Sequence, residues 1–331
     1  MSSDENPQER PAEQLAALLK AAADPLRLEV LRVLARDSYG VLELVSIFEL
    51  KQSSMSHHLK VLASAGLVAT RREGNSIFYR RALTSVDPLL GEAQRRLFIS
   101  VDSLPLEPEL QARLDEIQSE RETASRKFFT ENAGKFREQA DLIASFPVYQ
   151  EQVAEALLAA PFDKTGENRL ALELGPGEGE FLPFLAERFD TVFALDNSPA
   201  MLETSRQLVH SKGLNNVELV LGDTRRLHEL DIAAQCIVVN MVLHHTPSPA
   251  QIFSDLASSL ASGGVLLVTD LCRHDQAWAQ EACGDLWLGF EPQDLSQWSA
   301  EAGLEEGQSI YFALRNGFQI QIREFIKPAQ A

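Results

Sequence analysis

Short apolar runs organise the second half of the chain. One of them, Leu170–Leu174, is followed by glycines at alternate positions, Gly175, Gly177 and Gly179. A continuous apolar run of this length is typical of a strand buried on both faces of a parallel sheet. The glycines allow the backbone to turn sharply and to approach a ligand, and we expect a helix over 180–189. The pattern predicts a strand that leads into a binding turn, although an ordinary tight strand–helix turn is the alternative.

Four further apolar runs each end in polar residues. They are Thr191–Leu195 before Asp196, Val217–Leu221 before Asp223, Cys236–Val239 before Asn240 and the pair His244–His245, and Gly264–Thr269 before Asp270. Open α/β sheets bind ligands at the carboxyl ends of their strands, so these polar residues are candidate site residues. The segment Ser309–Phe325, with a turn at Arg315–Gly317, predicts a hairpin that completes a mixed sheet.

The order of these residues resembles the class I S-adenosylmethionine-dependent methyltransferases, whose ExGxGxG loop corresponds to Glu173–Gly179. The resemblance implies a doubly wound, Rossmann-like α/β domain with a seven-stranded mixed sheet. It also implies a site for S-adenosylmethionine or S-adenosylhomocysteine. The loop carries no basic residue to meet a pyrophosphate, which favours a phosphate-free, partly cationic nucleoside. The implied cofactor-binding residues are Glu173, Gly175, Gly177, Gly179, Asp196, Asn197, Asp223, Thr224 and Asn240.

Methyl transfer requires chiefly that the acceptor be aligned with the sulfonium methyl group. A base is needed only if the acceptor must lose a proton, and His244 or His245 is the candidate. The alternative is that both histidines cap the strand or contact the ligand. The place of an amino-methylating NPPY tetrad reads Asn240–Leu243, which disfavours DNA adenine methylation. Three aromatic residues could roof an acceptor pocket or instead form a domain or dimer contact: Trp278, Trp287 and Phe290.

The first hundred residues have helical periodicity. We predict helices over Ala12–Ala23, Pro25–Ala35, Val41–Phe48 and Ser54–Ala65, with Gln52 and Ser53 as turn and cap and Gly66 as the stop. Strands over Leu67–Thr70 and Ile77–Arg81 would flank a turn at 72–76. Two short helices across a tight turn, followed by a basic hairpin, indicate a winged helix-turn-helix of the α+β class.

Three segments, DPLRLEVLRVLA, SSMSHHLKVLASAGLV and REGNSIFYR, closely resemble the ArsR family of winged-helix repressors over nearly all of residues 12–97. The resemblance implies double-stranded operator DNA as a partner. The cysteine pair that many members use to sense metals is replaced here by Leu44–Ile47, so we expect no metal site. Apolar faces left on Ala12–Ala23 and Val86–Leu97 predict a homodimer. The candidate DNA-binding residues are Gln52, Ser53, Ser54, Ser56, His57, Lys60, Arg71, Arg72, Arg80 and Arg81.

Charge is distributed unevenly over the 331 residues, whose net charge is −18. Residues 20–100 hold 12 Lys/Arg and 8 Asp/Glu, whereas residues 101–331 hold 17 and 36. Only the first hundred residues therefore suit a phosphate backbone. The length allows two domains, and we expect a winged-helix domain over 1–100, a helical connector over 101–130 and a methyltransferase-like domain over 131–331.

Three further features bear on the compartment. The three cysteines share no CxxC spacing, so we expect neither disulfides nor a zinc site. No apolar stretch approaches the ~20 residues of a membrane span. The chain starts with the polar segment MSSDENPQER rather than a signal peptide, and we expect a cytoplasmic protein.

Two functions are compatible with this sequence. The first is a transcription regulator whose methyltransferase-like domain couples the cofactor state to operator binding, and the fusion to a DNA-binding domain favours it. The second is an enzyme that methylates a small-molecule acceptor and controls its own operon. A pocket filled by Trp287 and Phe290 would support the regulator, and a pocket with room for an acceptor would support the enzyme.

Overall fold

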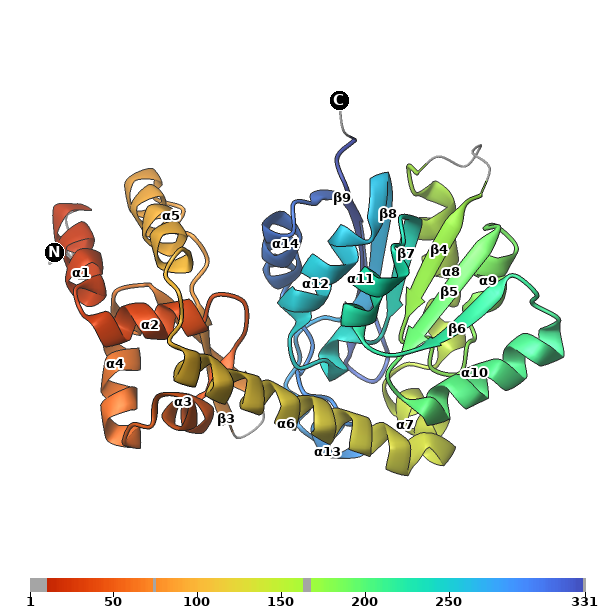
Figure 1. The fold of residues 1–331 in the computed structure, drawn as a ribbon, viewed down its shortest axis with the longest axis horizontal. Helices are drawn as coiled ribbons and strands as arrows, with labels where there is room; N and C mark the ends of the chain where they lie inside the picture. The colour runs from red at the N-terminus through yellow and green to blue at the C-terminus, as the bar shows by residue number, and fades with distance from the viewer. Residues whose placement is uncertain (1–10, 74–75, 163–167, 330–331) are drawn as a thin grey trace, which may run out of the picture. The chain divides into compact units, whose positions relative to one another are not determined.

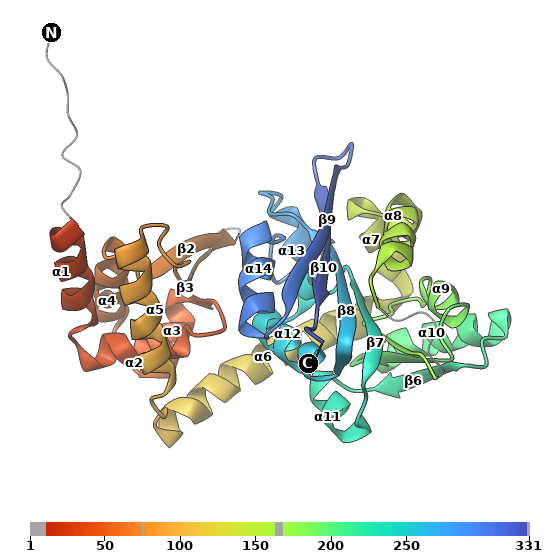
Figure 2. The same cartoon turned by 90° about the horizontal axis from the view of Figure 1, so that it is seen from above.

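The computed structural model describes residues 11–73, 76–162 and 168–329. The chain divides into two compact units, Met1–Glu120 and Arg121–Ala331, and the division falls inside one continuous helix, α6 (Pro108–Asn132). The first unit is mainly helical, and the second surrounds a large sheet with helices (Figures 1 and 2). Among the described residues, no helix combines the length and apolarity that a membrane span requires.

The described residues of the first unit form, besides α6, the helices α1 (Pro11–Ala22), α2 (Pro25–Val33), α3 (Val41–Phe48), α4 (Gln52–Ser64) and α5 (Pro88–Asp102). Asp24 caps α2, because its Oδ1 accepts a hydrogen bond of 3.0 Å from the Arg27 amide. Helices α3 and α4 form the predicted helix-turn-helix. However, α4 begins earlier than predicted, because the amides of Ser54 and Met55 bond to the Lys51 carbonyl. Gln52 and Ser53 therefore form the first turn of the helix rather than its cap.

A three-stranded antiparallel sheet completes the winged helix. Its strands are β1 (Tyr39–Gly40), β2 (Val68–Glu73) and β3 (Ser76–Arg81), in the order β1-β3-β2. The predicted turn at 72–76 includes residues 74 and 75, which lie outside the described residues. Met55, Leu59 and Leu62 are fully buried and anchor α4 to the core of this unit. The predicted winged helix-turn-helix is confirmed.

The second unit contains a seven-stranded mixed sheet in the order β6-β5-β4-β7-β8-β10-β9. The strands from β6 to β8 run parallel, and β10 is antiparallel to both β8 and β9. Their bounds are β4 (Leu170–Leu174), β5 (Thr191–Asp196), β6 (Val217–Leu221), β7 (Ala234–Asn240), β8 (Leu260–Leu271), β9 (Glu305–Ala313) and β10 (Gln319–Ile326). The predicted doubly wound sheet and its closing hairpin are confirmed.

Helices connect the strands of this sheet. They are α7 (Phe136–Ile143), α8 (Phe146–Ala159), α9 (Leu182–Ala186), α10 (Pro199–Lys212), α11 (Leu227–Leu230), α12 (Pro249–Ser258), α13 (Trp278–Cys283) and α14 (Pro292–Glu301). Three short 3₁₀ turns are η1 (Ala133–Lys135), η2 (Thr224–Arg226) and η3 (Leu243–His245). The helix predicted over 180–189 is limited to α9. Its shortening follows from the loop, where Gly179 and Leu182 make i→i+3 bonds to Pro176 and Gly179.

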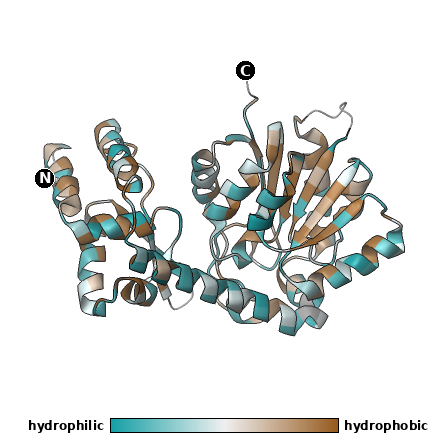
Figure 3. Ribbon diagram, in the orientation of Figure 1, coloured by the Kyte–Doolittle hydropathy of each residue, from teal (hydrophilic) through white to brown (hydrophobic). Residues whose placement is uncertain are grey.

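The central strands are rich in apolar residues, which are brown in Figure 3, whereas α6 is largely teal and white. Ala171, Val238 and Leu267 are at most 1% exposed. Both faces of a parallel sheet must be covered, which explains why these runs are continuous rather than alternating. The carboxyl ends of β4 to β7 consequently meet along one edge, and the polar residues that follow them are brought together there.

Candidate functional site

The turn after β4 is built from glycines in the left-handed region of the backbone map. Their φ values are +64° at Gly175, +56° at Gly177 and +81° at Gly179, which other residues rarely adopt. The Gly175 amide donates to the Leu195 carbonyl at 2.8 Å and so ties the turn to β5. A Cβ on Gly175 would lie 2.6 Å from Val242 Cγ2. The turn therefore tolerates no side chain there.

A cavity of about 220 Å³ opens beside this turn. Its walls come from the carboxyl ends of β4 to β7 and from α6, α7 and α8. Gly179 is not among its lining residues, since a Cβ there would contact Leu182 and Ser205 instead. The other residues predicted to bind the cofactor all line the cavity: Glu173, Gly175, Gly177, Asp196, Asn197, Asp223, Thr224 and Asn240.

Glu173 and Asn240 lie side by side in the cavity wall. Burial raises the pKa of Glu173 to about 8, against the opposing effect of the Asn240 side chain. Asn240 Nδ2 donates to Glu173 Oε1 at 3.5 Å. The other oxygens, Glu173 Oε2 and Asn240 Oδ1, are buried and have no hydrogen-bond partner among the described residues. Because unpaired buried polar atoms are costly, this wall suits a polar ligand.

Asp196 ends β5 in the same cavity. Its Oδ1 accepts a hydrogen bond of 2.8 Å from the Ser198 amide. Burial raises the pKa of Asp196 to about 6, and the backbone amides of Ser198, Gly177 and Asn197 oppose this rise. A carboxylate accepts up to about four hydrogen bonds, so Asp196 retains capacity for ligand hydroxyl groups.

Asp223 is engaged by a neighbouring arginine. Arg225 Nε donates to both carboxylate oxygens, at 3.1 and 3.0 Å, and these bonds lower the pKa of Asp223. The same guanidinium lies 3.4 Å from Glu122 of α6. All three side chains are at least 40% exposed, so a ligand that bonds Asp223 would compete with Arg225. Thr224, in contrast, is buried and donates to the Asp255 carboxylate.

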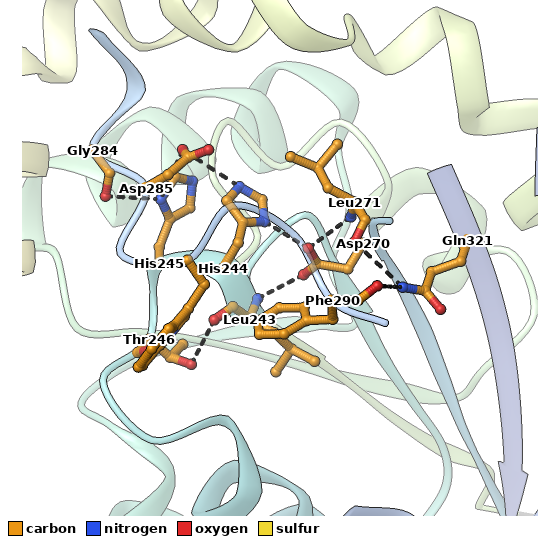
Figure 4. Close-up of polar contacts among 11 residues, drawn as sticks. Leu243, His244, His245, Thr246, Asp270, Leu271, Gly284, Asp285, Phe290 and Gln321 are labelled. Atoms are coloured by element: carbon orange, nitrogen blue, oxygen red, sulfur yellow. Dashed lines mark hydrogen bonds and ion pairs between the residues drawn. The ribbon is translucent and has the colours of Figure 1, made fainter. Parts of the chain in front are cut away.

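His244 and His245 lie in η3, shortly after β7, and both line the cavity. Figure 4 shows their polar contacts. His244 Nδ1 is 2.7 Å from Asp270 Oδ1. Asp285 lies beyond the other edge of the ring, with its Oδ1 3.9 Å from His244 Nε2 and 3.7 Å from His245 Nδ1. The two predicted base candidates therefore share one buried carboxylate neighbour, Asp285.

The two histidines differ in their tendency to hold a proton. Burial opposes the charged form of His244, but Asp270 and Asp285 outweigh burial and raise its pKa to about 9. Burial, and then the charge on His244, lower the pKa of His245 well below its ordinary value. At neutral pH His244 already carries the proton that a base must accept, so His245 is the better base candidate of the two.

The aromatic residues expected to roof an acceptor pocket do not line the cavity. Trp287 and Phe290 are 3% and 1% exposed, Trp278 is 41% exposed, and none of the three lines the cavity. Trp287 Nε1 instead donates to the Thr246 carbonyl at 2.7 Å. The rings that do line the cavity come from α6, α8 and the loop before α9: Phe129, Phe146, Tyr149 and Phe181.

Sequence reasoning missed several polar residues of the cavity. Arg137 of α7 pairs with Glu178 at 2.6 Å and with Glu180 at 2.8 Å, beside the glycine turn. Ser125 of α6 donates to the His245 carbonyl at 3.0 Å. The sequence offered one indication of these residues, because the segment that leads into such a sheet often covers the ligand. That tendency identifies a segment of the chain and not the individual side chains within it.

The recognition helix α4 exposes the polar side chains that were predicted to face DNA. Gln52, Ser53, Ser56, His57 and Lys60 are exposed, and Ser54 is partly exposed. On the wing, Arg72 is exposed and Arg80 is partly exposed. This surface combines hydroxyl, imidazole, amide and ammonium groups on one helix with guanidinium groups on the adjacent hairpin.

Two of the four candidate wing arginines lie in the interior instead. Arg81 is 6% exposed, and its guanidinium makes a bidentate pair with Asp102 at 3.0 and 2.7 Å while Nε donates to the Leu31 carbonyl. Arg71 is 9% exposed and pairs with Glu73. Buried, paired guanidinium groups cannot reach phosphates without breaking these contacts. We therefore leave both residues out of the DNA-contacting surface.

Two family models match the chain. The model described as "Bacterial regulatory protein, arsR family" matches residues 24–70, and the model described as "Methyltransferase domain" matches residues 172–268. Among solved structures, a methyltransferase from Haloferax volcanii in complex with its activator Trm112 is 16% identical. It covers 60% of this chain and 97% of its own, with a TM-score of 0.48. A likeness with this TM-score carries no argument. The fold assignment therefore rests on the strand order.

Curated relatives match the first unit. The biofilm growth-associated repressor of Agrobacterium fabrum is 43% identical over 74 residues, 22% of this chain and 63% of the relative. The transcriptional activator HlyU of Vibrio cholerae is 39% identical over 90 residues, 27% of this chain and 82% of the relative. This chain thus spans less than two thirds of the first relative and most of the second. It belongs to the arsR family of bacterial regulatory proteins and carries a methyltransferase domain after the DNA-binding unit.

Proposed function

We propose that this protein is an operator-binding transcription regulator whose second unit binds S-adenosylmethionine or S-adenosylhomocysteine, and that this binding changes its affinity for DNA. The observation that supports this coupling is that helix α6 contributes residues to both units. In the first unit, Arg113 Nε of α6 donates to the Ile47 carbonyl at 2.6 Å, and Gln118 Nε2 donates to Tyr39 Oη at 2.6 Å. In the second unit, Glu122 and Phe129 of the same helix line the cavity.

Three features support a nucleoside in the cavity. The glycine turn admits close approach to its main chain. Asp196 lies where ribose hydroxyls would be bonded, and Asp223 lies at the end of the neighbouring strand, β6, where an adenine amino group would reach it. Glu173 and Asn240 hold the buried unpaired oxygens that a polar ligand would satisfy. No phosphate group is required by any of these contacts.

The alternative is an active methyltransferase that acts on a small molecule. His245 supports it, because a neutral imidazole lines the cavity. Trp287 and Phe290 do not fill the cavity, so they do not decide between the two functions. The regulator is our first proposal because the methyltransferase domain is fused to a DNA-binding unit of the arsR family.

Operator affinity tests the proposal directly. We would measure it without ligand, with each nucleoside in turn, and for Asp196→Ala under the same conditions. A coupling free energy of about 1–3 kcal/mol corresponds to a change of about 5- to 150-fold. The two nucleosides differ by one methyl group and one positive charge, so we expect effects of different size. Identical affinities throughout would leave the small-molecule methyltransferase as the better account.

We also propose a homodimer formed through α1 and α5. Leu19 of α1 and Leu89 and Ile99 of α5 are more than half exposed, at 56%, 53% and 57%. Helices α1 and α5 pack against each other, so these side chains can form one apolar patch, and patches of this kind mark protein contacts. Such a dimer would bind a two-fold symmetric operator. A monomeric mass in size-exclusion chromatography and small-angle scattering would contradict it.

Wing and recognition-helix variants should behave differently on DNA. Arg72→Ala or Arg80→Ala should weaken binding to all sequences and reduce the salt dependence by about one unit of slope per lost phosphate contact. Ser56→Ala or His57→Ala should instead change the preferred bases. Arg36→Ala, outside this surface, is the control. Equal effects of wing and helix variants on all sequences would refute this docking arrangement.

A further inference from the structure

We propose that His244, His245 and Asp285 form a binding site for one divalent transition-metal ion, of which Zn²⁺ is the clearest example, in the wall of the cavity. Within the described part of the chain, one donor atom from each of these residues lies within 4.8 Å of the other two. Two imidazole nitrogens and one carboxylate oxygen form a donor set that suits Zn²⁺, Co²⁺ and Ni²⁺. The proposal is independent of whether the cavity binds a nucleoside.

The distances between donor atoms are close to those that a bound ion requires. Asp285 Oδ1 lies 3.9 Å from His244 Nε2 and 3.7 Å from His245 Nδ1. Bonds of about 2.0–2.1 Å in a tetrahedral site place donors roughly 3.4 Å apart. The carboxylate oxygen must therefore approach each imidazole by about half an ångström, and the two imidazole nitrogens, which lie within 4.8 Å of each other, must close by up to about 1.4 Å. Rotation of the side chains alone can supply a movement of this size.

Asp270 supports the site from behind. It is fully buried, its Oδ2 accepts the Leu243 amide at 2.9 Å, and its Oδ1 lies 2.7 Å from His244 Nδ1. A carboxylate that accepts the Nδ1–H of a histidine selects the tautomer whose Nε2 lone pair is available to a metal. That lone pair is on the side of Asp285 (Figure 4). This arrangement is the usual second layer around histidine ligands of zinc.

The segment that carries Asp285 is fixed against the histidines by its backbone. The amides of Leu286 and Trp287 both donate to the His244 carbonyl, at 2.9 and 3.1 Å. Gly284 adopts φ +77°, and a Cβ there would lie 2.4 Å from the Phe128 ring. The backbone segments that carry the carboxylate and the two imidazoles are thus held against each other, while their side chains can rotate. Because all three residues line the cavity, the fourth coordination position would open toward it.

Metal binding requires one particular tautomer of each histidine. His245 Nδ1 lies 3.3 Å from the Gly284 carbonyl, to which it donates when it carries a proton. On binding, that proton would move to Nε2, and the Gly284 contact would be lost. His244 would bind through Nε2, since its Nδ1 faces Asp270.

The test uses the full-length protein without nucleoside or DNA. We would titrate it with Zn²⁺ by calorimetry and with Co²⁺ by its visible ligand-field spectrum. We expect one ion per chain. Asp285→Asn and His245→Gln should each lower the affinity at least about tenfold, and Asp270→Asn about 10- to 100-fold. His210→Gln on exposed α10 and Cys283→Ser beside the site are the matched controls.

Three results would overturn the proposal. They are no stoichiometric binding to the unchanged protein, full binding to both Asp285→Asn and His245→Gln, or loss of binding in Cys283→Ser. Should a variant fail to fold, X-ray absorption on the Co²⁺-loaded unchanged protein decides instead. A shell of nitrogen and oxygen supports the site, and a sulfur ligand refutes it. Titrating the same samples with nucleoside tests the cofactor proposal separately. A failure of the metal proposal can then be told apart from a failure of the cofactor proposal.

Discussion

Asp196→Ala is expected to lower the affinity for both nucleosides by about 10- to 150-fold in calorimetric titrations. The variant would lose charge-assisted hydrogen bonds to ribose hydroxyls, which contribute about 1.5–3 kcal/mol. The pH dependence of the nucleoside affinity should also change in this variant. Since burial raises the pKa of Asp196 to about 6, the unchanged protein should lose affinity as the pH falls through 6 and the carboxylate is protonated. The Ala variant should lack this step.

Two companion variants sharpen this prediction. Gly177→Val should abolish binding, because valine is strained at φ +56° and would occupy ligand space. Glu203→Ala, at an exposed position of α10 that does not line the cavity, is the control and should leave the affinity unchanged. Circular dichroism and thermal unfolding would verify that each variant is folded. An unchanged affinity in Asp196→Ala would remove the basis of the cofactor proposal.

Glu173→Gln should stabilise the unliganded protein at neutral and mildly alkaline pH. The folded protein holds a proton on Glu173 up to a pKa of about 8, whereas the ordinary value is 4.5. A group whose pKa is raised by folding contributes stability that is complete below the lower pKa and is lost as the pH rises through the higher one. Between pH 5 and 7.5 this loss is about 3 kcal/mol, and the neutral glutamine removes it.

Denaturant unfolding followed by tryptophan fluorescence measures this effect in the second unit alone, because Trp278, Trp287 and Trp298 all belong to it. The free energy of unfolding should fall with pH in the unchanged protein and fall less in Glu173→Gln. A smaller slope should remain in the variant, contributed by Asp196. Glu218→Gln, at an exposed position of β6, is the control and should leave the slope as it was. Parallel slopes in all three proteins would contradict a buried, protonated Glu173.

The architecture was predictable because it depends on local patterns. Alternation, helical periodicity and the stop at Gly66 identify the winged helix. Continuous apolar runs identify parallel strands such as β4, and the topology of such sheets brings the polar residue after each strand to one edge. Asp196 and Asn240 were therefore candidates from their positions at strand ends, and Glu173 from the resemblance of its loop; all three line the cavity. The start of α4 was misplaced by two residues, because Lys51, which caps it, has no usual capping side chain.

The remaining features depend on contacts between residues distant in sequence. Arg81 is indistinguishable from a wing arginine until its partner Asp102 is known. Trp287 and Phe290 have the composition of a pocket roof, yet their positions are set by bonds to Thr246 and to β8. Asp285 is one acid among many in a strongly acidic segment, and only the fold brings it beside His245. Spacing along the chain carries no information about any of these pairs.

The continuity of α6 has a consequence for how such a fusion can vary between species. Each residue added to an α-helix rotates everything beyond it by about 100° and advances it by 1.5 Å. An insertion between Gln118 and Glu122 would therefore turn the cavity-lining residues away from the residues bonded to α3 and β1, unless it comprised about seven residues, or two full turns. Natural length differences in this helix should accordingly occur in whole turns, and a single inserted alanine should uncouple ligand from operator while both units stay folded.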